Sequence, residues 1–249
     1  MHDESEYLRV GNFLRRYGVL LADTPAFAVP RLHSDLTTRT VLAMDFVAGE
    51  PIESLVDAPQ AVRDRVMHLL FELLLRELFE FRLVQTDPNF ANYRFDHSTQ
   101  RLVLLDFGAN RSYKAAMSNH FKQLIKGAML HDRTAMRAAC LAIGYFEETT
   151  QERHVRAVLD IGELALAPFR DESGYAFENS NLPELVRSGV MALGMDGEFW
   201  TVPPTDAMLL ERKFGGLSLL AIRLKARVDL HALAQHALFT GRHPRPANS

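Results

Sequence analysis

The sequence predicts an α+β fold that is mostly helical. Apolar residues recur at helical spacing from about 59 to 82, which indicates one long buried helix. Downstream of Tyr113 the pattern stays helical, over about 115–130, 133–143, 151–166, 182–193, 205–226 and 230–239. Strand signals are confined to an apolar run at 40–47 and to two short segments around a polar turn at 96–100. Helices packed around a small β element are the expected architecture.

The composition is that of a globular protein and limits its partners. The 249 residues are 47% hydrophobic and 24% charged, which is enough to bury a sizeable core. The formal net charge is -3 and no tract of Lys and Arg is present, so we expect no nucleic-acid partner. The single cysteine, Cys140, excludes an internal disulfide and has apolar neighbours, which favours a packed thiol over a nucleophile.

The chain shows no membrane-spanning or export signal. No apolar stretch reaches the roughly 18 residues that span a bilayer. The start, Met1 to Glu6, lacks the basic and apolar pattern of a signal peptide, so a cytoplasmic protein is expected. The histidines do not show the spacing of a metal site. The segment 241–249 is predicted to be a polar tail.

Two segments lie before the long helix. Apolar positions predict a helix over 6–16, and Pro25 and Pro30 punctuate the connection after it. The run 40–47 is predicted to be a buried strand, ended by Ala48-Gly49-Glu50-Pro51.

Three oxygen-bearing side chains are predicted to meet at the open end of a hairpin. Asp87 belongs to the segment Gln85-Thr86-Asp87-Pro88-Asn89-Phe90-Ala91-Asn92, and Asp106-Phe107-Gly108 begins fourteen residues after Asn92. A hairpin that turns at 96–100 brings Asn92 and Asp106 together, with Asp87 just before the same end. Mg²⁺ prefers oxygen ligands and is commonly held by one or two carboxylates plus phosphate and water. The pattern therefore predicts Asn92 and Asp106 as magnesium ligands.

This arrangement suits phosphoryl transfer, in which metal ions bridge the phosphates and a second carboxylate faces the attacking hydroxyl or water. Asp87 is assigned that second role. The spacing Asp-x-x-x-x-Asn, followed by Leu-Leu-Asp-Phe-Gly, is similar to the catalytic and metal loops of protein kinases. The alternative interpretation makes Asp87 a helix-end cap and Asp-Phe-Gly a simple turn.

The apolar run resembles the kinase hinge, which binds adenine through main-chain groups. Met44 would line the back of the adenine pocket, and the backbones of Asp45 and Val47 would carry its hydrogen bonds. Gly108 would border the bound nucleotide. A plain core strand that ends at a glycine is the alternative.

These motifs resemble the UbiB (AarF-like) family of atypical kinases. The similarity lies in Arg76-Glu77-Leu78-Phe79-Glu80-Phe81 leading into Gln85-Thr86-Asp87, in 104–111, in 42–52, and in Arg212-Lys213-Phe214-Gly215-Gly216. The resemblance implies a protein-kinase-like C-lobe with ATP and Mg²⁺ as cofactors. It also implies a link to coenzyme Q and isoprenoid-lipid biosynthesis proteins, with ATPase activity better supported than protein phosphorylation.

The resemblance also implies what the chain lacks. The family's amino-terminal half, with an Ala-rich nucleotide loop and a strand lysine, has no counterpart here, and no Gly-x-Gly-x-x-Gly occurs. Residues 1–50 are then the remnant of an N-lobe with its hinge, and residues 51–240 are the helical C-lobe. Glu6, by its register with Phe13, matches the helix glutamate that pairs with the missing lysine, or is a solvated charge.

Three functions stay open at this point. The first is an ATP-dependent atypical kinase or ATPase, complete only with an upstream segment. The second is a small-molecule phosphotransferase, against which Gly108 counts because those enzymes replace this glycine with an acidic residue. The third is a catalytically degenerate scaffold or binding module. Arg223, Lys225 and Arg227 would allow peripheral contact with an anionic membrane surface, or form an ordinary solvated face.

Overall fold

A computed structural model describes residues 6–87, 89–199 and 201–240, and confirms the α+β, mostly helical class. The helices are α1 (Glu6–Leu20), α2 (Gln60–Arg76), α3 (Ala115–Met129), α4 (Arg133–Ile143), α5 (Glu152–Ala165), α6 (Leu182–Met195), α7 (Thr205–Arg223) and α8 (Leu230–Gln235). Short 3₁₀ or π turns cover Ile52–Asp57, Glu77–Phe81, Phe90–Asn92, Ala167–Arg170 and His236–Thr240. The predicted tail at 241–249 lies outside the described residues.

The strands are short and form three small sheets. They are β1 (Phe27–Ala28), β2 (Glu50–Pro51), β3 (Leu83–Gln85), β4 (Tyr93–Asp96), β5 (Arg101–Leu104), β6 (Asn110–Ser112), β7 (Tyr175–Ala176) and β8 (Arg227–Val228). The largest sheet has the order β1-β5-β4-β2, and separate antiparallel pairs join β3 to β6 and β7 to β8. Apart from the predicted hairpin, these two- and three-residue strands were missed, because so few residues give no alternating pattern.

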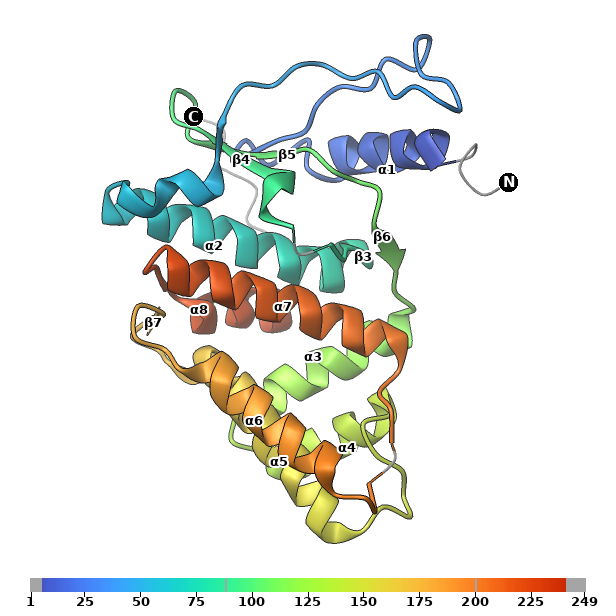
Figure 1. Cartoon of the computed structure of the whole chain (residues 1–249), viewed down its shortest axis with the longest axis vertical. Helices are drawn as coiled ribbons and strands as arrows, with labels where there is room; N and C mark the ends of the chain where they lie inside the picture. Colours follow the sequence, from blue (N-terminus) through green and yellow to red (C-terminus); the bar gives the residue numbers. More distant parts are fainter. Residues whose placement is uncertain (1–5, 88, 200, 241–249) are drawn as a thin grey trace.

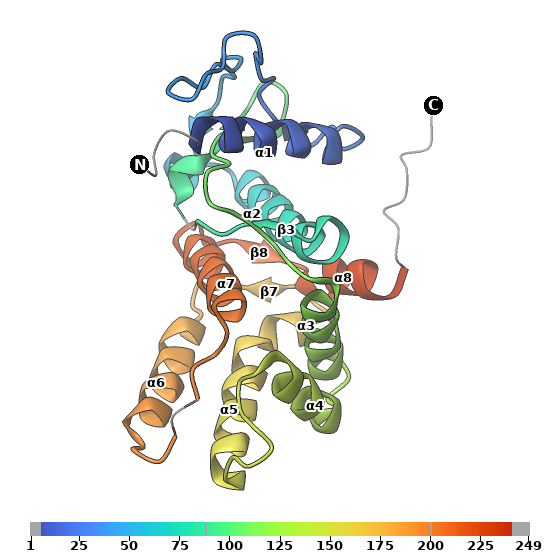
Figure 2. The ribbon, with the colours of Figure 1, turned by 90° about the vertical axis from the view of Figure 1, so that its right-hand side faces the viewer.

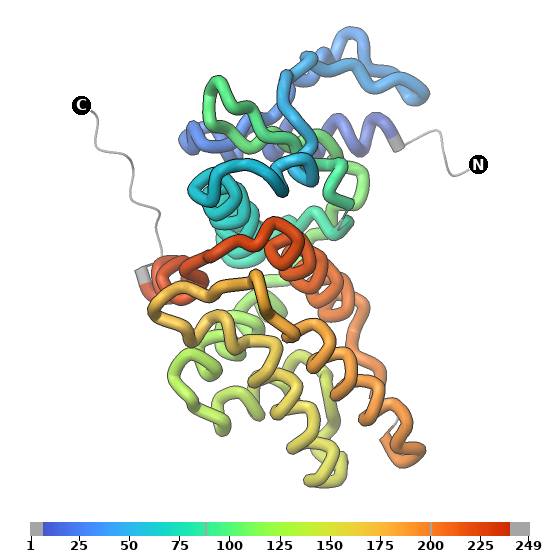
Figure 3. The backbone as a smooth tube through the Cα atoms, turned by 60° about the vertical axis from the view of Figure 1, so that its left-hand side comes forward, coloured from blue at the N-terminus to red at the C-terminus, as the bar shows by residue number. Residues whose placement is uncertain are grey.

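The elements lie in three tiers (Figure 1). The upper tier holds α1, the four-stranded sheet and the long connection over 21–49. The middle tier holds α2, α7 and α8, and the lower tier holds α3 to α6 (Figure 2). The backbone trace shows the carboxyl-terminal helices crossing between the blue-to-green upper part and the yellow-to-orange lower part (Figure 3). Helices α7 and α8 are therefore packed against α2, which precedes the predicted catalytic loop, and Asp206 at the start of α7 contacts Tyr113, which follows it.

Helix α2 occupies the centre, as its sequence predicts. Its second half is buried on nearly every side because it packs against both α7 and α8. The expected single helix to about Arg82 instead changes after Arg76 into the π turn Glu77–Phe81, and Arg82 then takes a left-handed conformation with φ of 51°. That change of pitch directs the chain sharply into β3.

The predicted hairpin is confirmed as β4 and β5, with Tyr93 opposite Leu104. Its turn is fixed by Asp96, whose carboxylate accepts hydrogen bonds from the backbone N of Ser98 at 2.8 Å and from Thr99 Oγ1 at 2.7 Å. Ser98 Oγ also donates to this carboxylate, at 2.6 Å. This bond, followed by those from Thr99 and the Ser98 backbone, lowers the pKa of Asp96 to about 2. Such an Asx-type turn sets the hairpin register and so places the residues at its open end.

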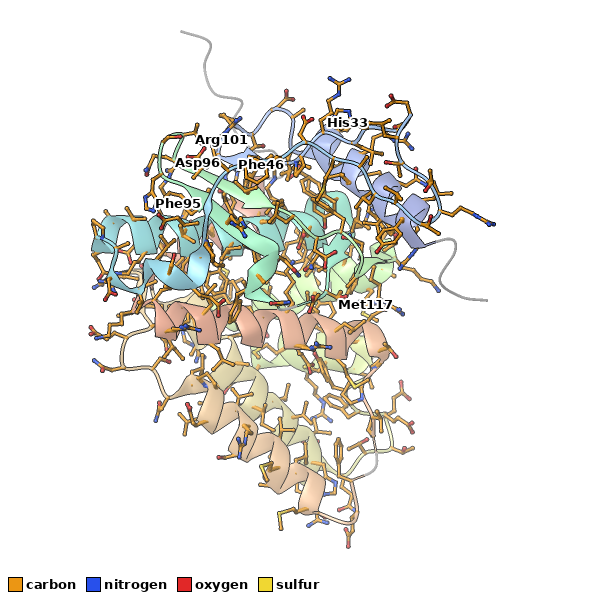
Figure 4. The ribbon with its side chains drawn as sticks, turned by 45° about the horizontal axis from the view of Figure 1, so that its top comes forward. His33, Phe46, Phe95, Asp96, Arg101 and Met117 are labelled. Carbon is orange, nitrogen blue, oxygen red and sulfur yellow. The ribbon has the colours of Figure 1, made fainter. Side chains whose placement is uncertain are left out.

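The predicted buried strand over 40–47 is wrong in both extent and burial. The segment forms one isolated bridge, between Met44 and Leu32, because its backbone pairs only with the neighbouring part of the same connection. Val41 is 52% exposed and Phe46 is 94% exposed. Figure 4 shows Phe46 and His33 on the same edge of the molecule as the hairpin turn. Apolar character alone therefore did not indicate burial at this position.

The remaining helices agree with their predicted ranges to within a few residues. Helix α4, for example, begins after Asp132, whose carboxylate caps the Ala135 backbone N, and ends at Gly144 with φ of 100°. Cys140 is 2% exposed on the inner face of this helix. Burial raises the pKa of its thiol to about 12, which agrees with a packed thiol.

Candidate functional site

The β3–β6 pair holds together the two loops that carry the predicted site residues. Gln85 at the end of β3 lies opposite Asn110 at the start of β6. One residue further on, the backbone N and the side-chain Oγ1 of Thr86 both donate to the Ala109 carbonyl, each at 2.8 Å. Asp87 and the Asp106-Phe107-Gly108 turn are thus attached to opposite sides of a fixed backbone ladder.

Asp87 and Asn92 are in direct contact. Asn92 Nδ2 donates to Asp87 Oδ2 at 3.1 Å. The short turn between them is ordered by Asn89, whose side chain accepts from the Ala91 backbone N at 3.1 Å. This contact uses the amide nitrogen of Asn92, and the amide oxygen, which is the atom that binds cations, takes no part in it. The two residues form one polar unit, of which Asn92 is the buried member.

Asp106 follows β5 after one intervening residue, Leu105, which contacts Asn92. The Leu105 backbone N donates to the Asn92 carbonyl at 2.9 Å, so the hairpin brings Asn92 next to the start of the Asp106 turn. The Asp106 carboxylate accepts from the Gly108 backbone N at 2.7 Å. An added Cβ at Gly108 would lie 3.2 Å from Asp106 Oδ1, closer than most such contacts. Gly108 therefore leaves room for this carboxylate orientation.

An open hollow of about 490 Å³ borders Asp106. Its lining residues are Arg9, Thr86, Asp106, Gly108, Ala109, Asn110, Arg111 and Leu209. Asp87 and Asn92 are not among them, so the structure brings these two together and sets Asp106 beside the neighbouring hollow. Its lining residues Arg9 and Arg111 were given no role in the sequence analysis. Arg111 is paired with Asp206 at the start of α7.

The donor set fits a magnesium ion bound with phosphates. It consists of the Asp106 carboxylate and the Asn92 amide oxygen, both hard ligands of the kind that Mg²⁺ prefers, with the Asp87 carboxylate in contact with Asn92. In the described ranges 6–87, 89–199 and 201–240, no three His, Cys, Asp or Glu side chains gather as a metal-binding group. Mg²⁺ is commonly held by one or two protein carboxylates, with phosphate and water completing its coordination.

The predicted adenine-binding segment is exposed and only partly paired. Asp45 Oδ1 lies 2.6 Å from His33 Nε2, and the Asp45 backbone N donates to the Arg31 carbonyl at 2.9 Å. The Asp45 carbonyl is not used in these contacts. Met44 is 37% exposed and Val47 is partly buried. The segment then runs into β2, which pairs with β4 and so connects it to the strand that follows Asn92.

A buried ion pair lies behind the predicted catalytic loop and was missed in the sequence. Lys213 Nζ on α7 lies 2.5 Å from Glu77 Oε2, and the two side chains are 2% and 1% exposed. Both residues occupy positions where the helical pattern expects an apolar side chain, for example between Leu210 and Leu217 on α7. The sequence signal for this pair was one acidic and one basic residue, each within an apolar helical stripe. A buried charge requires a partner of opposite charge, so each residue indicated the other.

Two tyrosines complete the environment of this pair. Tyr17 Oη on α1 donates to Glu77 Oε1 at 2.6 Å and contacts the Leu83 carbonyl at 3.2 Å. Burial, followed by the Glu77 charge, raises the pKa of Tyr17 well above its ordinary value. Burial also raises the pKa of Tyr93. Burial alone would lower the pKa of Lys213, but the Glu77 charge outweighs it and the pKa is raised. Lys213 is therefore cationic at neutral pH.

Helix α1 packs directly on the Asp106 turn. The rings of Tyr17 and Phe107 are 5.1 Å apart between centroids. Val10 is the nearest α1 residue to Gly108, with its Cγ2 3.9 Å from the point that a Cβ on Gly108 would occupy. Glu6, the glutamate predicted to pair with the strand lysine that the chain lacks, is the first residue of α1. Its side chain lies outside the described part of the chain.

The sequence is similar to known atypical kinases. The family model of the ABC1 atypical kinase-like domain matches residues 1–140. The chain is 32% identical over 99% of its length to the mitochondrial atypical kinase COQ8B of Rattus norvegicus and 31% identical over 90% to that of Danio rerio. It is also 31% identical over 90% to the mitochondrial atypical kinase COQ8 of Saccharomyces cerevisiae. The chain spans 36%, 47% and 45% of the zebrafish, rat and yeast proteins, respectively.

A solved structure shares the fold. Rv3197 of Mycobacterium tuberculosis, determined in complex with erythromycin, superposes with a TM-score of 0.73 over 97% of this chain and 60% of its own. The sequence identity is 17%, so this likeness concerns the fold alone.

Proposed function

Because this chain belongs to the family of ABC1 atypical kinase-like domains and is related to the COQ8 atypical kinases, we propose that it binds ATP with Mg²⁺. The proposed chemistry is phosphoryl transfer or ATP hydrolysis linked to coenzyme Q biosynthesis. The observation that carries the proposal is the bond from Asn92 Nδ2 to Asp87 Oδ2, formed where the hairpin returns to Asp106. It supports a polar site in which Asp87 and Asn92 are in contact and Asp106 begins the turn after the hairpin, the three residues that this chemistry requires.

Each residue has a separate role in the proposal. Asn92 and Asp106 hold Mg²⁺, which when bound neutralises charge on the phosphates. Asp87 orients the attacking hydroxyl or water and accepts its proton. The hydrogen bond from Asn92 Nδ2 to Asp87 Oδ2 holds the Asp87 carboxylate in one orientation. Gly108 maintains the turn that aims the Asp106 carboxylate.

The nucleotide base is assigned to the exposed segment before β2. Met44 would contact the base, and the Asp45 carbonyl and the Val47 backbone N would pair with its edge. Support comes from the connection of this segment through β2 to the hairpin, which sets it at a fixed place relative to Asn92. The partial exposure of Met44 leaves an apolar surface for an aromatic ligand.

Two other functions make different predictions. A catalytically degenerate scaffold would retain the fold without binding metal and nucleotide, whereas the contact between Asp87 and Asn92 favours a maintained site. A small-molecule phosphotransferase would share the Asp87 and Asn92 loop. The close approach of Gly108 to Asp106 disfavours an acidic residue in place of this glycine.

The family relationship suggests partners for this protein and bears on its location. Coenzyme Q or isoprenoid-lipid biosynthesis proteins are the proposed partners. No helix among the described residues is long and apolar enough to cross a bilayer. The rat, zebrafish and yeast relatives are named as mitochondrial, and the cytoplasmic location predicted from this sequence stays a prediction.

The test is direct binding of a metal–nucleotide complex. Mn²⁺ replaces Mg²⁺ and gives a paramagnetic signal that reports even weak sites, so Mn²⁺ with ATP is titrated into the chain. We expect saturable binding that depends on both metal and nucleotide and is lost in Asp106→Asn. Equal signals from the wild type and Asp106→Asn, or no binding by the wild type, would refute the proposed function.

A further inference from the structure

A cluster of five buried polar residues joins five elements behind the predicted site. We call it the Glu77 cluster; it comprises Tyr17, Glu77, Gln85, Tyr93 and Lys213. The residues come from α1, the π turn after α2, the β3 and β4 strands, and α7. All are less than a tenth exposed. Such a network is costly to bury unless its members pair, so its position next to the loop requires explanation.

Glu77 is the centre of the cluster because it bonds to three separate segments. Its Oε2 contacts Lys213 Nζ at 2.5 Å, and its Oε1 accepts from Tyr17 Oη at 2.6 Å. The same Oε1 accepts from the backbone N of Gln85 at 3.4 Å. Gln85 is the last residue of β3 and precedes Asp87 by two positions. A single carboxylate thus ties the root of the Asp87 loop to α1 and α7.

The geometry points to Glu77 and Lys213 as positioning residues, which hold the end of β3 and α1 in the arrangement that sets the Asp87–Asn92 pair and the Asp106 turn on opposite sides of the β3–β6 ladder. This inference rests on the proposed function for its catalytic meaning. Neither residue lines the hollow, so both act through the backbone at Gln85 and through Tyr17. Tyr17 extends the effect to the Asp106 turn because its ring packs on Phe107.

Simple stabilisation does not account for this arrangement. Two charges of this kind can be replaced by apolar side chains of similar volume with little loss of stability. With an apolar pair, however, the Gln85 backbone N would lose the acceptor that Glu77 provides. Tyr17 Oη would keep only the Leu83 carbonyl as its acceptor. The ion pair therefore provides directional hydrogen bonds that orient the start of the Asp87 loop, and apolar packing provides none.

The double variant Glu77→Leu with Lys213→Met separates the two roles. It removes both charges at once, so no buried charge is left unpaired. We expect amide hydrogen exchange over 83–92 to become about tenfold or more faster, while exchange in α4 and α5 stays unchanged. The affinity for Mn²⁺ with ATP should fall roughly 10–100-fold, as for other residues that orient metal ligands. A purely structural role would alter exchange in all tiers or in none.

A distant buried polar pair provides the control. His154, 3% exposed, bonds through Nε2 to Asp196 at 2.9 Å in the lower tier. His154→Phe should leave both exchange over 83–92 and nucleotide affinity unchanged. Tyr17→Phe is a second test that opens no cavity, and it should raise exchange over 83–92 by a smaller factor.

The two proposals fail differently. Unchanged exchange over 83–92 in both the double variant and Tyr17→Phe would overturn the positioning role, whatever the nucleotide result. Selective loss of protection there supports it. Absence of Mn²⁺ with ATP binding by the wild-type chain refutes the proposed function, and the exchange measurement then still decides whether the Glu77 cluster holds the loop.

Discussion

Lys213 Nζ lies 2.5 Å from Glu77 Oε2, although 136 positions separate the two residues in the chain. The contact links α7, near the end of the described chain, to the π turn that leads into β3. Because both side chains are buried, each depends on the other for compensation of its charge.

The single variant Lys213→Met should therefore be strongly destabilised. It leaves the Glu77 carboxylate buried without its cation, and we expect a loss of about 3–5 kcal/mol in the free energy of unfolding. Adding Glu77→Leu should recover most of that loss, because the second change removes the unpaired charge. Urea unfolding of the wild type, both single variants and the double variant measures this cycle. Additive losses would contradict the coupling.

Stability should decline at alkaline pH. Tyr17, Tyr93 and Lys213 have pKa values raised by folding, so each holds its proton more tightly in the folded state. Their contribution to stability is complete below the unfolded pKa values of about 10–10.4, and is lost as the pH rises towards the higher folded values. Urea unfolding between pH 8 and 11, spanning roughly that range, should show this fall. A smaller slope is expected for the Glu77→Leu, Lys213→Met double variant.

Asp87→Asn should separate chemistry from binding. An asparagine at this position keeps an oxygen that accepts the bond from Asn92 Nδ2, so the loop is expected to retain its shape. In the protein completed by its upstream segment, the affinity for Mg²⁺ with ATP should stay close to that of the wild type, whereas phosphate release should fall by roughly 10²–10⁴-fold because the base is lost. Calorimetry and a phosphate-release assay measure the two quantities. Unchanged turnover would remove Asp87 from the proposed role.

Gly189 should be intolerant of a side chain. A Cβ at this position on α6 would lie 2.8 Å from Ile161 Cγ1 on α5, so Gly189→Ala must displace the Ile161 side chain or the helix that carries it and should cost about 1–3 kcal/mol. Gly194, on the same helix, has open space where a Cβ would lie, with no neighbouring atom within 4 Å, and Gly194→Ala is the matched control. The control should be neutral or stabilising by up to about 1 kcal/mol, from helix propensity. Thermal unfolding of both variants tests the close packing of α5 on α6.

Long periodic elements were predictable from sequence because their signals are local. The apolar spacing of α2 and the capping residues of α4, Asp132 and Gly144, mark their helices without reference to the rest of the chain. The hairpin was predictable for the same reason, since the turn that begins at Asp96 is stabilised within a few residues.

The candidate loops were also visible in sequence, from the order and spacing of Asp87, Asn92 and Asp106 in the chain. Their roles stay predictions, and the structure adds the contact between Asp87 and Asn92. The segment 40–47 shows where local signals fail. Its residues are apolar, yet a strand needs a partner, and the partner available is only the adjacent connection.

The sequence by itself determined the helical class, the hairpin and the residue types of the candidate site, because these depend on periodicity, turn chemistry and short spacing. Only the tertiary structure decided that Glu77 and Lys213 form a pair, that Tyr17 joins them to Phe107, and that Phe46 is exposed. Burial of a charge depends on which distant segment packs against it. That information is absent from any single helix and arises when α1, α2 and α7 come together.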